Sequence, residues 1–261
     1  LLENGIYLKG NQRIMETKDS NLILEGIRVI DLSRVLAGPF CGALLGDMGA
    51  DVIKVEDTKT GDELRTWPPH KEGESPGFLV NNRNKRGIAV NMKAPEGVEV
   101  IRRLVRDADV LIENFRTGTM EEFGLGYEKL AGINPKLIYC SVSAFGRTGP
   151  RAQEAGYEAL MQAFAGIMSI TGEPDGPPVR CGVSFLDLTT GILCAMGTVC
   201  ALYQRAHTGL GQRIDGSLLT TAIGLAALVE IARSGVRLER DLVLAATASE
   251  EMAGPANGAA W

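Results

Sequence analysis

The sequence predicts an α/β fold in which helices cover both faces of a doubly wound, mostly parallel sheet. Two observations lead to this prediction. Short apolar runs of strand length alternate, up to about residue 143, with stretches of helix length. The connections between successive runs are long enough to hold a helix, as the right-handed crossovers of a parallel sheet require.

The pattern begins with a strand, a helix and a second strand. Residues 27–33 form an apolar run that ends in polar side chains, which is typical of a buried strand. The next segment, 38–48, has Pro39 near its start and Gly49 directly after it. Proline early in a helix and glycine just beyond its end are the usual punctuation of a helix. Residues 51–56 are then the second strand.

The pattern continues with three more strands. A polar, proline-rich stretch over 57–77 is predicted to be a surface loop, and 87–92 is the third strand. The segment 95–106 has apolar side chains on one helical face, and 109–115 and 137–143 are the fourth and fifth strands.

The character of the chain changes after Pro150. An apolar stripe at helical spacing is most simply explained as part of the core, and it contains Tyr157, Leu160, Met161, Phe164, Ala165 and Met168. Further along, residues 188–205 are rich in small and apolar side chains and are predicted to form a long helix.

The composition favours an ordinary globular protein and excludes several functions. The net charge of −5 argues against a nucleic-acid partner, because no basic stripe is present to neutralise phosphates. Only His70 and His207 are present, so a histidine-based metal site or a Ser-His triad is poorly supported, and we assign no metal ligands. Five cysteines without a C-x-x-C pair predict core thiols in a reducing compartment, from which we expect a cytoplasmic location.

No segment is predicted to interact with a membrane. The apolar run 188–203 carries threonine and glycine and is shorter than the stretch of about 18 uncharged residues that a spanning helix needs. Residues 1–21 are mixed and polar, without the basic and apolar regions of a signal peptide. Because the chain does not begin with methionine, we expect a fragment.

Asp187 is the most informative side chain, and two roles are open to it. It follows the apolar run 183–186 and precedes the long helix, which is the usual place for an aspartate that caps a helix N-terminus. A carboxylate there feels the positive end of the helix dipole and is expected to stay ionised. Aspartate is also an established covalent nucleophile, so the same carboxylate could carry an acyl group.

Ligand contacts are expected beyond the carboxyl ends of the strands, where doubly wound sheets bind their ligands. The segments 34–38 and 114–116 follow the first and fourth strands, although Gly38-Pro39 and Asn114 are also ordinary turn formers. No G-x-G-x-x-G sequence follows the first strand, which argues against a nicotinamide-dependent dehydrogenase.

Seven separated motifs together resemble the family III CoA-transferases, which include the formyl-CoA transferases, the carnitine-type CoA-transferases and the α-methylacyl-CoA racemases. The resemblance runs from about Leu24 to about Leu219, and the motifs are LSRVLAGPF, GADVIKVE, NKRGIAVNMKAPEG, DVLIENFRTG, NPKLIYCSVSAFGRTGP, GYEALMQAFAGIMSITG and TGLGQRIDGSLL. It implies the Rossmann-like large, CoA-binding domain of that family in a truncated form. It also implies an interlocked homodimer.

The resemblance implies a reaction in which coenzyme A moves from an acyl-CoA donor to a small organic acid. Asp187 would form an acyl anhydride and then an aspartyl-CoA thioester, without a metal or a bound cofactor. Glu158 matches a glutamate near the active site of the formyl-CoA transferases, although a lone first-turn glutamate is more often solvated.

The residues that contact coenzyme A in the family can be carried over to matching positions. Leu36 and Ala37 would lie near the pantetheine and the thiol. The nucleotide and pyrophosphate region would be lined by Val90, Asn91, Met92, Lys93, Asn114, Phe115 and Arg116, with Tyr157 also in contact with the ligand. Lys93 and Arg116 suit phosphate chemically, although a solvated loop lysine is as common.

Two departures from the family pattern bear on the reaction. Leu36 stands where some transferases have a glutamine, so one polar contact of the active site is absent. Tyr157 stands where the racemases have a histidine, and tyrosine, with a pKa of about 10, is a poor base near neutral pH. We therefore favour a transferase over the alternatives, which are an acyl-CoA racemase or isomerase and a non-catalytic CoA-binding fragment.

Three regions are expected along the chain: an N-terminal extension over 1–24, the large domain over 25–224 and an atypical tail over 225–261. The segment 233–251 is similar to a strand of the zinc aminoacylase and carboxypeptidase metallopeptidases. A Glu-Glu pair alone does not bind zinc, so no metal site is assigned there. The tail is expected to be foreign to the family, with a junction around 222–229.

Overall fold

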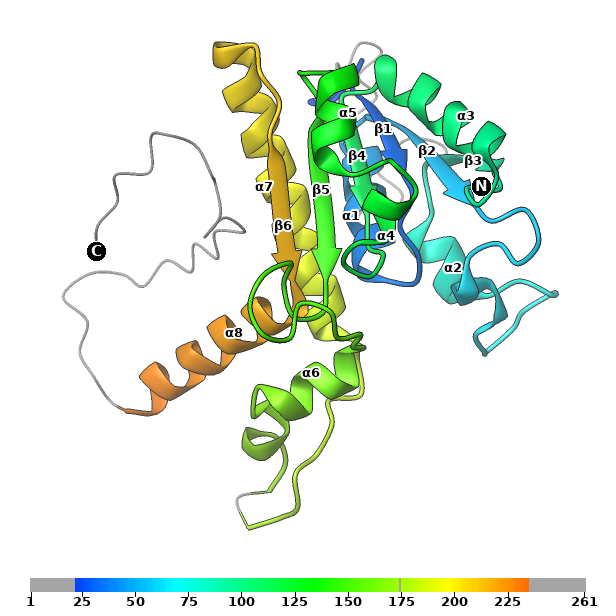
Figure 1. The fold of residues 1–261 in the computed structure, drawn as a ribbon. Coiled ribbons are helices and arrows are strands. Elements are labelled where there is room, and N and C mark those ends of the chain that lie inside the picture. The colour runs from blue at the N-terminus through cyan, green and yellow to red at the C-terminus, as the bar shows by residue number, and fades with distance from the viewer. Residues whose placement is uncertain (1–21, 174, 235–261) are drawn as a thin grey trace, which may run out of the picture.

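The described part of the chain, residues 22–173 and 175–234 of a computed structural model, forms a six-stranded parallel sheet with helices on both faces (Figure 1). Its strand order is β3-β2-β1-β4-β5-β6, and every neighbouring pair is parallel. This confirms the predicted doubly wound α/β fold. The order reverses between β1 and β4, and a crevice at such a reversal is where these sheets bind ligands.

The first five strands lie close to the five predicted positions, and a sixth follows them. They are β1 (Arg28–Asp31), β2 (Asp51–Glu56), β3 (Lys85–Ala89), β4 (Val110–Glu113), β5 (Ile138–Ser143) and β6 (Arg213–Ser217). The helices are α1 (Ala37–Asp47), η1 (Glu63–Thr66), α2 (Pro76–Asn81), α3 (Pro95–Arg106), α4 (Thr119–Glu122), α5 (Tyr127–Ile133), α6 (Glu158–Phe164), η2 (Ile167–Ile170), α7 (Phe185–Thr208) and α8 (Leu218–Arg233).

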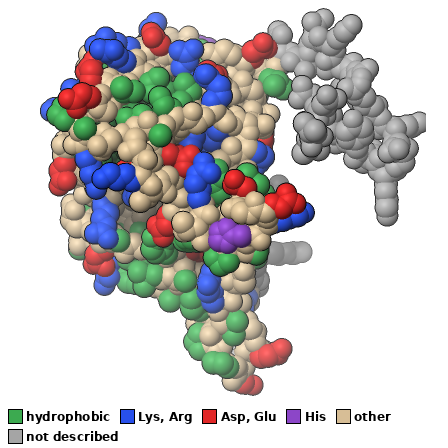
Figure 2. Space-filling view, turned by 90° about the vertical axis from the view of Figure 1, so that its right-hand side faces the viewer, with side chains coloured by type: hydrophobic (Ala, Val, Ile, Leu, Met, Phe, Trp, Pro, Cys, Tyr) green, Lys and Arg blue, Asp and Glu red, His purple; other side chains and the backbone are tan. Residues whose placement is uncertain are grey.

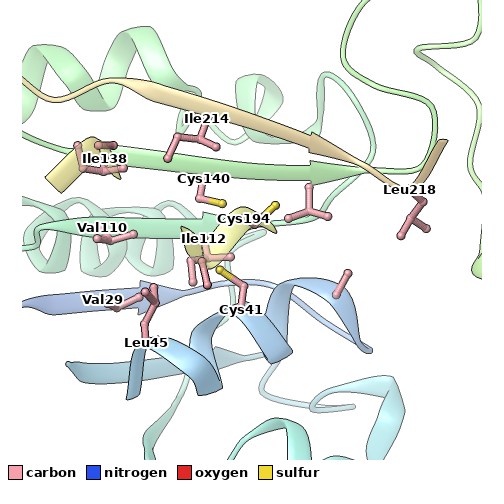
Figure 3. Packing of buried hydrophobic residues seen from close by; sticks show 14 of the residues in the cluster. Val29, Cys41, Leu45, Val110, Ile112, Ile138, Cys140, Cys194, Ile214 and Leu218 are labelled. Carbon is pink, nitrogen blue, oxygen red and sulfur yellow. The ribbon is translucent and has the colours of Figure 1, made fainter. Parts of the chain in front are cut away.

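The core consists of two apolar clusters, one on each face of the sheet. Alternate residues of one strand point to opposite faces, so Val29 belongs to one cluster and Ile30 to the other. The first cluster packs the sheet against α1 and α7, and three of its members are the cysteines Cys41, Cys140 and Cys194 (Figure 3). The second packs the other face against α3 and α5.

A close approach of the two helices brings the second turn of α7 against the first turn of α1. A side chain at Gly191 would place its Cβ 2.7 Å from the carbonyl oxygen of Ala37, so only glycine allows this packing. The contact sets Asp187 of α7 beside the loop that follows β1.

Several elements differ from the predictions. The third strand begins two residues earlier than expected, because Lys85 already pairs with Val52 of β2, and it ends at Ala89 and not at residue 92. Helices η1 and α2 interrupt the predicted loop 57–77, and Ser75 caps α2. The sixth strand and α8 were not predicted. Helix α8 runs through residue 225, where the tail was expected to begin, and most of 233–251 lies outside the described residues.

Helix α7 is longer than the run 188–203 on which the membrane prediction rested. Within the described residues it is the one helix that is long and apolar enough to cross a membrane, judged by length and composition alone. Its inner side packs against α1, β5 and β6, as expected of a core helix of a doubly wound sheet. The helix is therefore long enough to span a membrane, contrary to the length expected from the sequence. Its packing against the sheet and α1 explains why its inner face is apolar.

Candidate active site

The carboxyl ends of β1, β4, β5 and β6 open onto a cavity of about 590 Å³. Helix α6, which lies beyond the carboxyl end of the sheet in Figure 1, and the segment that leads into α7 contribute the residues of its other side. The residues that line it are Arg34, Val35, Leu36, Ala37, Glu63, Trp67, Asn114, Phe115, Arg116, Thr117, Val142, Ser143, Ala144, Ala152, Glu154, Ala155, Gly156, Tyr157, Glu158, Ala159, Arg180, Ser184, Asp187 and Leu218. The cavity thus lies at the switch point where a ligand was expected.

Asp187 lies in the first turn of α7, and its carboxylate borders the cavity. The expectation that it caps this helix is wrong. The helix begins at Phe185, two residues earlier, and Ser184 occupies the capping position without a side-chain bond. At the third helical position, Asp187 makes no capping hydrogen bond, so its carboxylate is available to a ligand.

Glu158, at the start of α6, takes over the capping of α7. Its Oε1 accepts a hydrogen bond from the backbone N–H of Leu186 at 3.1 Å and another from Nε2 of Gln162 at 3.0 Å. The residue is 3% exposed, so the expectation of a solvated first-turn acid is wrong. A carboxylate from one helix thus satisfies a free N–H group at the beginning of another.

The two carboxylates are coupled electrostatically. Burial, and secondarily the negative charge of Glu158, raise the pKa of Asp187 to about 7. This overturns the expectation that the helix dipole keeps Asp187 ionised, because desolvation outweighs the dipole. The Oε2 atom of Glu158 is buried and has no hydrogen-bond partner among the described residues. A carboxylate that titrates near neutral pH and faces a cavity is typical of a functional site.

Six of the ten predicted ligand contacts line the cavity together with Asp187 and Glu158. They are Leu36, Ala37, Asn114, Phe115, Arg116 and Tyr157. Ala37 is buried and begins α1, so it can offer its backbone but little side-chain surface.

The other four, Val90, Asn91, Met92 and Lys93, do not line this cavity. They follow β3 at the edge of the sheet, two strands away from β1. The Val90 side chain is buried in the core and Met92 packs against the same cluster, whereas Asn91 and Lys93 are exposed. Only Asn91, Lys93 and the backbone of this segment are therefore free to meet a ligand.

Hydrogen bonds tie together the loops after β1 and β4. The Asn114 side chain accepts from the backbone N–H of Arg34 at 2.8 Å and donates to its carbonyl at 2.7 Å. The guanidinium of Arg34 lies over the Phe115 ring, 4.9 Å from its centroid. Asn114 thus lines the cavity and also fixes the backbone of Arg34 in its wall.

A buried ion pair holds the turn before α1. Val35 has a φ of 68°, a left-handed conformation that a β-branched residue rarely adopts. Its N–H donates to Oδ1 of Asp62 at 3.0 Å, and Oδ2 of Asp62 pairs with Nζ of Lys54 at 2.7 Å. Lys54 also donates to the carbonyl of Ser33. The network fixes the strained turn that presents Leu36 to the cavity.

The apolar stripe on α6 is only partly core. Met161 is fully buried, but Tyr157 is 61% exposed, and Leu160 and Phe164 are also exposed. Figure 2 shows apolar side chains on the surface of the lobe that projects at the bottom of the molecule, where α6 lies in Figure 1. The prediction that the whole stripe packs inside is therefore wrong, because α6 extends beyond the end of the sheet.

Sequence reasoning missed three residues that support the site: Gln162, Lys54 and Asp62. Gln162 is four positions after Glu158 on a helix, and this spacing places the two side chains on one face. This spacing could have identified Gln162 from the sequence. The Lys54–Asp62 pair carries no comparable signal, because it joins a strand to a loop.

Neither histidine lines the cavity. Among residues 22–173 and 175–234, no group of three or more His, Cys, Asp or Glu side chains is arranged to hold a metal ion.

Comparison with known proteins gives concordant matches. The sequence model of CoA-transferase family III matches residues 24–237. The chain is 51% identical, over 203 residues, to a succinate–glutarate CoA-transferase of Agrobacterium fabrum, a match that covers 75% of this chain and 51% of that protein. It is 48% identical over 215 residues to a mouse succinyl-CoA:glutarate CoA-transferase, covering 82% of this chain and 49% of the relative.

Solved structures agree with the sequence matches. A crystal structure of a CAIB/BAIF family protein from Brucella suis superposes with a TM-score of 0.77 and 46% identity, over 84% of this chain and 60% of that one. The chain spans about half the length of the curated relatives it matches. The match to the family model covers all of the segment 222–229, where a junction was expected.

Proposed function

The chain belongs to CoA-transferase family III, and from this we infer that it moves coenzyme A from an acyl-CoA donor to a small organic acid. The observation that carries the proposal is the position of Asp187. Its carboxylate borders the cavity at the switch point of the sheet. It does not cap α7, because Glu158 does so instead.

In the proposed reaction, the ionised carboxylate of Asp187 attacks the thioester carbonyl of the donor. The C–S bond breaks, CoA leaves as the thiolate, and a mixed anhydride forms on Asp187. The thiolate then attacks the Asp187 carbonyl, which releases the donor acid and leaves an aspartyl-CoA thioester. An acceptor carboxylate repeats these steps in reverse and departs as the new acyl-CoA, which restores the free carboxylate.

Each attack places negative charge on a carbonyl oxygen, and backbone N–H groups of this chain are available to stabilise it. Helix α1 begins at the edge of the cavity, and no side chain caps its N-terminus. We assign the stabilising role to the N–H groups of its first turn, at Ala37 and Gly38. A single such donor is typically worth about 2.7–4 kcal/mol to the transition state.

The remaining contacts with coenzyme A are assigned by position. Leu36 and Ala37 would hold the pantetheine arm beside Asp187, and Arg116 would bind the pyrophosphate. The exposed side chains of Asn91 and Lys93 would meet the nucleotide further along the edge of the sheet.

The organic acid is proposed to be a short dicarboxylic acid. The names of the bacterial and mouse relatives specify succinate or succinyl-CoA and glutarate, which are both dicarboxylates.

The proposal is tested by incubating the full-length protein with succinyl-CoA and glutarate and following glutaryl-CoA and free succinate by mass spectrometry. We expect the two products to appear in equal amounts. Hydrolysis to free CoA alone, or deuterium exchange at the α-carbon of the acyl group without acyl exchange, would contradict the proposal.

The pH dependence of kcat/KM for succinyl-CoA should report the ionisation of Asp187. Only the ionised carboxylate attacks, so kcat/KM should rise with pH and reach half of its plateau near pH 7, where Asp187 titrates. Glu158→Gln removes the neighbouring negative charge, which lowers the pKa of Asp187 and should move the midpoint to lower pH.

Glu96→Gln, on the exposed surface of α3, is the matched control and should leave the midpoint of that profile in place. An unchanged or higher midpoint in Glu158→Gln would contradict the coupling between the two carboxylates.

We also propose that the protein is a cytoplasmic homodimer. Five free cysteines fit a reducing compartment. Ile192, Met196 and Tyr203 form an exposed apolar stripe along α7 at helical spacing, and a second copy of the chain is the proposed partner.

Replacing Ile192 and Met196 together with aspartate should weaken the dimer and yield a monomer in light scattering at micromolar concentration. The matched control, aspartate at the exposed positions Thr58 and Lys59, should stay dimeric. A monomeric wild-type protein would contradict the proposal.

A further inference from the structure

Three arginines of the described chain stand apart from the rest. Arg34, Arg116 and Arg180 form no ion pair and donate no side-chain hydrogen bond, whereas every other arginine among residues 22–173 and 175–234 does one or the other. All three line the cavity that contains Asp187. Because an unpaired guanidinium is a strong anion-binding group, the cavity is built to receive more than one negative charge.

The three guanidinium groups belong to different sides of the cavity. Arg34 and Arg116 come from the loops after β1 and β4, and Arg34 lies over the Phe115 ring in the second of these loops. Arg116 also borders a second cavity, beside β4 and β5. Arg180 instead belongs to the segment that leads directly into α7 and to Asp187.

Hydrogen bonds anchor the segment that carries Arg180. The backbone N–H of Cys181 donates to Oε1 of Gln162 at 2.9 Å, and the Gln162 side chain is fully buried. Nε2 of Gln162 donates to Glu158, the same carboxylate that accepts from Leu186. The segment between Arg180 and Asp187 is therefore tied to one buried carboxylate at both of its ends, and both residues line the cavity.

The acidic residues of the cavity leave Arg180 uncompensated during the reaction. Glu154 is already paired with Arg151, and Glu158 is buried and committed to Leu186 and Gln162. Glu63 also lines the cavity, but it belongs to η1 and not to α6 or to the segment that carries Arg180. Asp187 loses its negative charge when it becomes an anhydride or a thioester. A second carboxylate on the bound acyl group would supply the missing charge.

We propose that Arg180 is a specificity-determining residue, which binds the far carboxylate of a dicarboxylic acyl group while the near carboxyl reacts at Asp187. This inference rests on the proposed function. A monocarboxylic acid of equal length would leave the guanidinium unpaired, so the site should discriminate between the two by the charge at the far end.

The test compares two acceptors of five carbons, glutarate and pentanoate, with succinyl-CoA as the donor and the full-length protein. Arg180→Gln should lower kcat/KM for glutarate by about 10- to 100-fold, the usual value of a charged hydrogen-bonded contact. It should change kcat/KM for pentanoate by less than about threefold. Arg180→Lys should recover part of the loss, because the charge returns without the bidentate geometry.

Arg116→Gln is the matched control, since it removes an unpaired guanidinium from the other side of the same cavity. It should raise KM for succinyl-CoA but leave the ratio of glutarate to pentanoate unchanged. An Arg180→Gln variant with the wild-type ratio, or with equal losses for both acids, would overturn the inference and leave the proposed function standing. Absence of transfer to either acid in the wild-type protein would contradict both the proposed function and the inference about Arg180.

Discussion

Asparagine in place of Asp187 should abolish CoA transfer, with a loss in kcat of at least about 10⁴-fold, as found when the nucleophile of a covalent mechanism is removed. Asparagine keeps the size of the side chain and its place in the first turn of α7. It has no ionisable oxygen with which to form an anhydride. Steady-state assays of glutaryl-CoA formation measure the loss.

Two controls separate a chemical role from a structural one. Asp175→Asn makes the same change at an exposed loop position and should leave the rate unaltered. The pH dependence of stability gives the second control. The folded-state pKa of Asp187 is raised to about 7. Its contribution to the free energy of unfolding is therefore present at acid pH and is lost as the pH rises through that value.

As the pH increases from 5 to 8, the free energy of unfolding of Asp187→Asn should therefore rise relative to that of the wild type. Urea denaturation at each pH measures this difference. A variant that loses both activity and stability at pH 8 would indicate a structural role for Asp187. Full activity in the asparagine variant would show that Asp187 is not the nucleophile.

Alanine in place of Asp62 should lower the free energy of unfolding by about 3–5 kcal/mol, because it leaves the buried ammonium of Lys54 without its partner. Lys54 and Asp62 have side-chain exposures of 3% and 0%. The substitution also removes the acceptor for the N–H groups of Val35 and Leu64, and the left-handed Val35 depends on the first of these bonds.

Urea denaturation at pH 7 measures this loss, and two variants calibrate it. Asp51→Asn breaks exposed pairs with Arg86 and Arg28 and should cost far less. The double variant Lys54→Met, Asp62→Leu replaces the charged pair by apolar groups and should recover much of the stability lost in Asp62→Ala. It should still raise KM for succinyl-CoA, because the turn before Leu36 is no longer fixed. A small loss in Asp62→Ala, similar to that of Asp51→Asn, would contradict the account of this turn.

Much of the fold follows from local sequence signals. The strands β2 and β5 and the helix α3 lie where the apolar periodicity and the proline and glycine residues place them, because propensity, capping and packing agree there. The sixth strand was not predicted, because its sequence, Arg213-Ile214-Asp215-Gly216-Ser217, contains one apolar side chain and a glycine. It becomes a strand by pairing with β5, which is a long-range contact.

The site shows the same division between local and long-range causes. Asp187 was identified from its local context and the resemblance to a family, and that context also predicted a cap. The cap comes instead from Glu158, 28 positions before the Leu186 N–H that it accepts from, and only the folded structure brings this carboxylate to the start of α7. The pKa of Asp187 follows from the same arrangement, since burial and the neighbouring charge arise together.

We propose that Asp187 carries coenzyme A covalently during turnover. The most direct test incubates the full-length protein with succinyl-CoA in the absence of an acceptor, adds hydroxylamine and maps the modified peptide by mass spectrometry. A hydroxamate on Asp187, dependent on succinyl-CoA and absent from the Asp187→Asn variant, is the expected result. An unmodified Asp187 peptide in a protein that is actively transferring CoA would contradict the account.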